Sequence, residues 1–389
     1  MPRKLGRNKN TVSEGSLVIM DSISSDARRF ENEFALLFKE RGDIPPHQDS
    51  IDRYWFVNLA AERPPWTDTG IEVAQGDRLS VFCAGRAWIK KHPQAWVEPY
   101  FALWLRIGEP AKMFRTPRGS FTFIAGHSGP LYLSNVFPGQ WVDAYGRMAN
   151  TAVVQESAAG EFAVLLIRWR ADPAQGLSEL AHRPGPAARL AEEELQRLRN
   201  PVVIPEGWTY LPSLGDAGIF SRADLPGAAV IRCQCDNDAM ILQKSLEAPF
   251  APDTRVRWSW KVESLPSMRA EDSLTTHDYL SLAVEFDNGQ DLTYLWSAAL
   301  EPERSFRCPI ASWSKRETHI VIRSGSEGLG RWIKEERNLW RDYQNAIGSP
   351  PARIVGVWLI AASIFQHGRG RCEYREIELD TASEASRVL

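Results

Sequence analysis

The residues best suited to chemistry lie between Thr276 and Tyr343, where titratable and aromatic side chains concentrate. Residues 278–287 alternate polar and apolar side chains, and this pattern predicts a strand with Glu285 on its polar face. A carboxylate there, facing a second one on a neighbouring strand such as Glu317, can form a general acid and base pair. A solvated strand face explains the same pattern, so both interpretations of Glu285 stay open.

Two histidines fall in the same region. His277 precedes the predicted strand, where an imidazole at a loop edge titrates near neutrality and can reach a ligand. His319 lies within another predicted strand, residues 318–324, where a hydrogen-bonded sheet histidine is ordinary. No G-x-S-x-G motif or Cys–His signature accompanies them, which disfavours a serine or cysteine hydrolase. If the protein is an enzyme, we expect a lyase or hydrolase with Glu285 and His277 as catalytic acid–base residues.

A set of residues beyond Glu285 is suited to binding a polar ligand. The expected ligand-binding residues are Tyr294, Trp296, Trp332, Arg337 and Asn338. Residues 332–343 have helical spacing, which would place Trp332 and Trp340 on one face. Arg337, Asn338 and Asp342 could surround an oxyanion or sugar hydroxyls. They could equally brace this helix against a sheet through buried hydrogen bonds.

The sequence predicts neither a metal ligand nor a cofactor. Asp287 and Asp291 flank Asn288–Gly289, a pairing typical of a hairpin turn, so we assign both acids to the turn. The glycine-rich residues 324–330 lack the lysine of a phosphate-binding loop. The five cysteines are odd in number, with no CxxC pair and no histidine at metal-binding spacing. Buried, reduced cysteines are therefore expected, as in a cytoplasmic protein.

Composition limits the class of protein. A chain of 389 residues is too long for one ordinary core, and 43% hydrophobic with 24% charged residues is typical of a soluble globular protein. The formal net charge of -3 provides no general attraction to nucleic acid. No apolar run approaches the length of a membrane span, and residues 1–10 lack the apolar core of a signal peptide.

The order of elements predicts an all-β fold with two sandwich domains of jelly-roll type. Short strands punctuated by glycine and proline, without helices between them, favour antiparallel sandwiches. Helical patterns occur near the N-terminus, at residues 187–198 and at residues 332–343. The expected segments are a tail with an amphipathic helix (1–50), a first sandwich (51–170), a helical linker (171–200), a second sandwich (201–380) and a tail (381–389).

One predicted strand of the first sandwich carries an unusual face. The residues that alternate along it are Trp96, Glu98, Tyr100, Trp104 and Arg106. Such a mixture of aromatic and charged side chains suits neither a dry core nor a plain solvated surface. It predicts a ligand platform or a contact between the two domains.

The first domain resembles a known lectin fold. Residues 68–77, followed by 81–85 and by Gly160-Glu-Phe-Ala-Val-Leu165, resemble the galactophilic bacterial lectins, which are small calcium-dependent jelly rolls. The resemblance implies a lectin-like sandwich. In those lectins Asp and Asn residues just before the last strand hold calcium. Residues 154–159 lack the asparagines at the matching place, so the calcium site is not expected here.

The second domain resembles an uncharacterised bacterial domain-of-unknown-function family, number three-zero-four-seven. The residues that carry the resemblance are Trp258–Val262, His277–Asp278, Glu285–Phe286, Leu292–Trp296, Trp332, Glu336–Asn338, Asp342–Tyr343 and Gly348. The family implies a sandwich similar to carbohydrate-active ones. Its members carry two aspartates in a turn where this chain has Ala361–Gln366, which contains neither.

These observations support two functions. We predict a protein that binds a carbohydrate or similar polar small molecule in a cleft of the C-terminal sandwich, with metal-free lyase or hydrolase chemistry as its enzymatic form. The alternative is a non-enzymatic assembly protein whose sandwich faces and N-terminal helix bind a protein partner or a second copy. Neither function involves nucleic acid.

Overall fold

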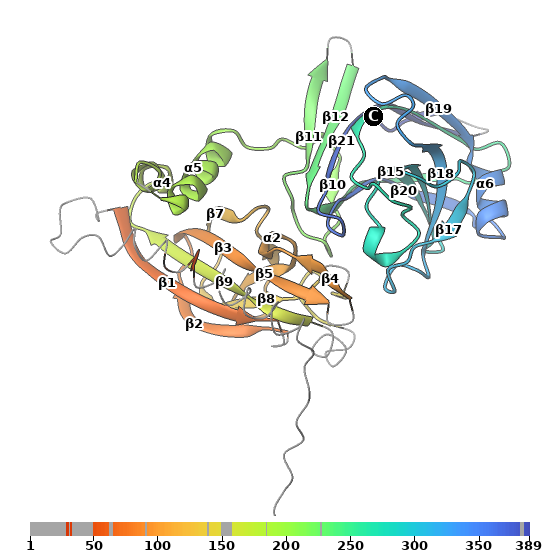
Figure 1. Cartoon of the computed structure of the whole chain (residues 1–389). Helices are drawn as coiled ribbons and strands as arrows, with labels where there is room; N and C mark the ends of the chain where they lie inside the picture. The colour runs from red at the N-terminus through yellow and green to blue at the C-terminus, as the bar shows by residue number, and fades with distance from the viewer. Residues whose placement is uncertain are drawn as a thin grey trace, which may run out of the picture.

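The structure of the chain is a computed structural model (Figure 1). It describes residues 29–30, 32, 50–61, 65–89, 92–137, 140–148, 158–183, 185–225, 228–381 and 385–389. Most of the predicted N-terminal helix and the segment matching the lectin calcium site lie outside these residues. Within the described ranges, no helix is both long and apolar enough to span a membrane.

Residues 51–169 form two facing sheets, as the predicted all-β class requires. The first has the order β1-β9-β3-β4 with β7 beside β3, and the second β2-β8-β5-β6. The strands are β1 (Ile51–Ala60), β2 (Thr67–Val73), β3 (Arg78–Ile89), β4 (His92–Val97), β5 (Leu103–Ile107), β6 (Phe114–Arg115), β7 (Ser120–Ile124), β8 (Gly129–Asn135) and β9 (Ala158–Trp169). Alternate residues such as Val81, Leu105 and Val164 pack together between the sheets.

Two helices cover the back of the first sheet. Helix α4 (Pro173–Ala181) begins at Asp172, whose carboxylate accepts a hydrogen bond from the Ala174 amide, and α5 (Pro186–Arg199) follows it. Strand β9 is therefore apolar on both faces, with Leu165 packed beside α4 and α5 residues. Helix α5 contains the predicted residues 187–198, whereas α4 was not predicted.

Residues 209–387 form a second pair of sheets. A seven-stranded sheet has the order β10-β13-β20-β15-β16-β18-β17, and a six-stranded sheet β11-β12-β21-β14-β19 with β22 beside β21. The seven strands are β10 (Thr209–Tyr210), β13 (Ala239–Pro249), β15 (Leu280–Phe286), β16 (Asp291–Ser297), β17 (Ser305–Arg307), β18 (Glu317–Ser324) and β20 (Arg353–Ala362). The six are β11 (Phe220–Leu225), β12 (Ala228–Asp236), β14 (Arg255–Ser264), β19 (Ile333–Asn338), β21 (Arg369–Asp380) and β22 (Ala385–Arg387).

Aromatic rings hold these two sheets together. Trp258 stacks on Tyr294 with ring centroids 5.5 Å apart, and Trp260 packs on Trp296 at 5.6 Å. All four are fully buried. The alternation along β14 therefore marks the core face, as the sequence predicts, and β20 is central because it pairs with both β13 and β15.

The predicted hairpin is confirmed. Strands β15 and β16 pair antiparallel, and Gly289 turns the chain at a φ of 76°, which a side chain with a Cβ rarely adopts. The turn is shorter than predicted because Asp291 is already the first residue of β16 and is fully buried. The assignment of Asp291 to the turn was wrong.

The helix predicted over residues 332–343 is wrong in its first half. Residues 333–338 form β19, which pairs with β14 and places Glu335 opposite Trp258. Helix α6 (Leu339–Ala346) begins only after Asn338, whose side chain accepts a hydrogen bond from the Arg341 amide. The hydrogen-bonding edge of β14 decides the conformation here, and helical spacing alone could not reveal it.

The mixed face of the first sandwich is not one strand. Residues Pro99–Ala102 form a helical turn, α2, between β4 and β5. Trp96 stacks on His367 of the second sheet pair with centroids 3.7 Å apart, and the Tyr100 hydroxyl donates to the Asn237 carbonyl at 2.9 Å. Trp104 is fully buried. Two of these aromatic residues therefore lie in a contact between the two halves of the chain.

This contact predicts a pH dependence. Burial lowers the pKa of His367 to about 4, whereas an unfolded histidine titrates near about 6.5. The stability from neutral His367 is therefore present above pH 6.5 and is lost as the pH falls toward 4. We expect the urea midpoint difference between the wild type and His367→Gln to shrink between about pH 7 and pH 5. The control variant His127→Gln, at an exposed histidine, should have the same urea midpoint as the wild type at each pH. If the midpoint difference between the wild type and His367→Gln stays constant over this pH range, His367 does not cause the pH dependence.

Candidate functional site

The polar residues of the seven-stranded sheet lie on its outer face, the face turned away from the six-stranded sheet. Leu282 and Val284 of β15 enter the core, so Ala283 and Glu285 point the other way. Glu285 lies opposite Asp291 of β16, and Asp291 lies beside Glu317 of β18. Three carboxylates thus form a row across three neighbouring strands.

Two segments contact this outer face: residues 265–279, which include a short 3-10 turn (Leu274–Thr276), and residues 298–316, which include the edge strand β17. The Tyr279 hydroxyl donates to Glu317 Oε1 at 2.8 Å, and the Cys308 amide donates to the Glu317 carbonyl at 3.1 Å. Polar side chains that a one-sided sheet would expose to water are consequently buried here. Each of them needs a partner inside the protein.

One end of the carboxylate row reaches solvent. The Arg316 guanidinium donates to Glu285 Oε1 at 3.1 Å, and its Nε lies 3.6 Å from Asp291 Oδ2. The side chains of Glu285 and Arg316 are 25% and 34% exposed, whereas Asp291 is fully buried. The guanidinium lies 5.0 Å from the ring centroid of half-buried Trp313. We call Glu285, Trp313 and Arg316 the rim.

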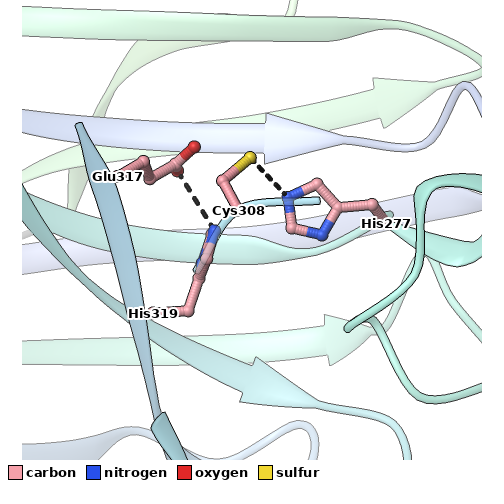
Figure 2. A group of neighbouring side chains, drawn as sticks. All are labelled: His277, Cys308, Glu317 and His319. Carbon is pink, nitrogen blue, oxygen red and sulfur yellow. Dashed lines mark hydrogen bonds and ion pairs between the residues drawn. The ribbon is translucent and has the colours of Figure 1, made fainter. Parts of the chain in front are cut away.

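The other end of the row is closed. His277, Cys308, Glu317 and His319 are all buried, and their nitrogen, sulfur and oxygen donor atoms lie within 4.8 Å of one another (Figure 2). His277 Nε2 is 3.4 Å from Cys308 Sγ, and His319 Nε2 is 3.5 Å from Glu317 Oε1. We call these four residues the buried cluster. They carry the donor atoms that transition metals prefer.

Burial controls the protonation of the titratable side chains in the buried cluster and at the rim. Desolvation lowers the pKa of His277 to about 4 and that of His319 further below its usual value, so both imidazoles are neutral. Desolvation also raises the pKa values of the Cys308 thiol and the Glu317 carboxyl. At the rim, burial raises the Glu285 pKa, and the neighbouring Arg316 opposes this shift.

The two residues predicted as catalytic lie on this outer face, but in different settings. Glu285 belongs to the half-exposed rim. His277 is only 1% exposed, and its Nδ1 donates to the Glu271 carbonyl at 2.6 Å. The expectation of an open imidazole that titrates near neutrality was wrong, because residues 265–279 fold down onto the sheet.

The residues predicted to bind ligand do not join the rim. Tyr294 and Trp296 are fully buried between the sheets, so neither ring is open for stacking on a ligand. Arg337 binds Asp342 and Glu303, and Asn338 caps α6. These contacts agree with the interpretation that Arg337 and Asn338 brace the helix against the sheet, and not with the interpretation that they bind a ligand. Half-buried Trp332 precedes β19 in the other sheet, with the Arg375 guanidinium 4.1 Å from its ring.

Five residues that complete the site were not predicted: Asp291, Thr293, Cys308, Trp313 and Arg316. The Thr293 hydroxyl donates to Asp291 Oδ1 at 3.2 Å and lies 3.5 Å from Glu317 Oε1, so it stands between the two ends of the row. Alternation along β16 could have placed Asp291 and Thr293 on one face. Nothing local to Cys308 marks it, because its neighbours in the cluster come from other elements.

Residues 216–378 match the model of a family described as "Protein of unknown function (DUF3047)". The match confirms the family resemblance of the C-terminal half, and it includes the rim and the buried cluster. A comparison with curated proteins gives no match.

Several solved structures are similar to parts of the chain. A PllA-like lectin, the N-terminal domain of EclA, is 18% identical and covers 31% of this chain and 98% of its own, with a TM-score of 0.24. TmCBM61 in complex with β-1,4-galactotriose is 13% identical and covers 45% of this chain and 88% of its own, with a TM-score of 0.24. The xyloglucanase domain of NopAA from Sinorhizobium fredii, in complex with cellobiose, is 7% identical and covers 46% and 99%, with a TM-score of 0.27. These neighbours are lectin or carbohydrate-handling domains.

The placement of Tyr294 predicts a structural role. Its hydroxyl donates to Asp342 Oδ2 at 2.9 Å, and Tyr294→Phe removes this buried bond. We expect the free energy of unfolding to fall by about 1–2 kcal/mol. In the matched variant Tyr343→Phe the lost partner is exposed Asn288, which water can satisfy, so the fall should be about 0.5 kcal/mol or less. Urea unfolding measures both, and equal effects would contradict the assignment.

Proposed function

We propose that the C-terminal sandwich binds a polar small molecule of the saccharide class at the rim. The observation that carries the proposal is one partly exposed guanidinium, Arg316, shared by Glu285 and the buried Asp291 beside an aromatic ring. This combination offers acceptors, donors and an apolar surface within one small area.

The chemistry of a sugar matches these groups. Sugar hydroxyls donate to carboxylates and accept from a guanidinium, while the apolar face of the ring packs on an indole. Asp291 Oδ2 and Arg316 Nε have no hydrogen-bond partner in the structure, although both are buried. These two atoms face each other as an ion pair at 3.6 Å, so the partly exposed side chains of Glu285 and Arg316 are the ones that a ligand can contact.

The enzymatic form of the proposal rests on Glu285. It is the predicted acid–base residue that reaches solvent, and Asp291 faces it on the adjacent strand. The proposed pair for lyase or hydrolase chemistry is thus Glu285 with Asp291, because Asp291 stands between Glu285 and the originally expected Glu317.

Binding is tested with the purified full chain. A glycan array and a thermal-shift screen of neutral and acidic saccharides should yield one class that raises the melting temperature. Glu285→Gln and Trp313→Leu should each weaken that binding by about 5- to 30-fold, since each removes a rim contact worth about 1–2 kcal/mol.

The control is Glu336→Gln, another exposed acid held by arginines, but on the six-stranded sheet. It should bind as the wild type does. If no saccharide shifts the melting temperature, and the chain elutes as a large particle, the rim proposal fails and the assembly function is favoured. If Glu285→Gln binds normally, the rim is not the site.

A further inference from the structure

We propose that His277, Cys308, Glu317 and His319 form a binding site for a divalent transition-metal ion, and that Zn²⁺ is the ion they suit best. The four come from three separated places in the chain: the end of the covering segment 265–279, the residue after β17, and two alternate positions of β18. Figure 2 shows their donor groups converging from these elements. This site goes beyond the rim and does not depend on it.

The spacing of the donor atoms fits a tetrahedral ion. Bonds of about 2.0–2.3 Å to nitrogen, oxygen and sulfur place tetrahedral ligands about 3.3–3.8 Å apart. His277 Nε2 and Cys308 Sγ are 3.4 Å apart, and His319 Nε2 and Glu317 Oε1 are 3.5 Å apart. The widest separation in the cluster, up to 4.8 Å, needs only a small inward movement of side chains.

His277 is oriented as a ligand. Its Nδ1 lies 2.6 Å from the Glu271 carbonyl, which can only accept, so the proton must be on Nδ1. Nε2 therefore presents its lone pair toward Cys308. A hydrogen bond from the outer ring nitrogen to a carbonyl is the usual support of a metal-bound histidine. The Tyr279 hydroxyl gives Glu317 a comparable outer bond at 2.8 Å.

His319 gives an independent reason for an ion. The side chain is fully buried, and neither ring nitrogen has a hydrogen-bond partner. Leaving such a group unsatisfied in the interior costs about 1–3 kcal/mol. An ordinary hydrogen-bonded core network explains the contact between Cys308 and His277 but leaves His319 without a partner. A metal ion bound by the two Nε2 atoms gives His319 its missing partner at that nitrogen, while His319 Nδ1 stays without one.

The charge and the type of the donor atoms indicate which ion the site would bind. A Cys308 thiolate and a Glu317 carboxylate together carry two negative charges, which a divalent cation balances inside the protein. Sulfur and imidazole ligands favour zinc and its transition-metal neighbours over Mg²⁺ and Ca²⁺, which prefer oxygen. Four protein ligands also complete a tetrahedron, which is typical of a structural zinc site.

A bound ion would fasten the covering segments to the sheet. It would tie residue 277, in the first segment, to β18, and it would add a side-chain link to residue 308, whose amide already pairs with the Glu317 carbonyl. Residues 313 and 316 of the rim lie in the second segment. The inferred role is therefore to hold the covered outer face together.

The first test uses the wild-type chain with its purification tag removed. After dialysis against a chelator, Zn²⁺ should bind at about one equivalent per chain by elemental analysis and should raise the melting temperature. Cobalt(II) should produce a thiolate-to-metal charge-transfer band in the near ultraviolet, because a coordinating thiol is deprotonated. Folded protein that shows neither a zinc-induced shift nor the cobalt band overturns the proposal.

Variants then assign the ligands. Cys308→Ser should abolish the charge-transfer band, and His319→Gln should weaken cobalt binding severely. Tyr279→Phe, which removes only an outer bond, should keep the band and weaken binding by about 10–100-fold. The matched controls are Cys83→Ser, where serine can still donate to the Gly119 carbonyl, and His127→Gln. Both controls should bind as the wild type.

Two outcomes contradict the assignment. If Cys308→Ser retains the band, or if Cys83→Ser loses it, the thiolate ligand lies elsewhere. Should a cluster variant fail to fold, the wild-type titration decides the question by itself. None of these measurements uses a saccharide. A negative result for metal binding therefore leaves the proposed saccharide binding at the rim intact, and a negative saccharide screen leaves the proposed metal site intact.

Discussion

The structure of the C-terminal half depends on one constraint: strands β15, β16 and β18 are buried on both faces. In an antiparallel sheet with one wet face, alternate polar residues would be hydrated. Here Asp291, Glu317 and His319 lie under the segments 265–279 and 298–316 and are cut off from water. Burying such groups is unfavourable unless each finds a hydrogen bond, an opposite charge or an ion.

The two ends of the outer face meet this constraint differently. At the rim, Arg316 balances two carboxylates and stays in contact with solvent, so its charge remains partly hydrated. At the buried cluster two neutral imidazoles face a thiol and a carboxyl. The Thr293 hydroxyl links the two ends. An exchangeable ligand suits the open end, and a fixed ion suits the closed one.

Two other buried carboxyl groups in the C-terminal half have hydrogen-bond partners within the protein and serve a structural role. Asp342 accepts from Tyr294 and Arg337, so its carboxylate is well satisfied. Asp278 accepts from the amides of Phe365 and Gln366. His319, in contrast, has no hydrogen bond at either nitrogen. That difference separates the buried cluster from the surrounding scaffold.

Local sequence patterns predicted an element correctly where the burial of one or both of its faces, or its turn residues, fixed its conformation. Alternation revealed the Trp258–Val262 strand and its core face, Asn288–Gly289 marked the hairpin, and the double-sided apolar run at residues 354–362 marked a central strand. The same local rules failed for residues 333–338, which pair with β14, and for the open position expected of His277. In both places a distant segment decided the outcome.

The sequence by itself determined the all-β class, the resemblance of the C-terminal half to one family of unknown function, and Glu285 as a polar position on a strand. Only the tertiary structure decided that Tyr294 and Trp296 are core residues and that Asp291 is part of the site. It alone joined His277 and Cys308 to Glu317 and His319. The physical reason is that strand periodicity is a local property, whereas donor atoms meet through sheet pairing and chain crossings. Such pairing joins residues as distant as His277 and His319, and no spacing motif records that proximity.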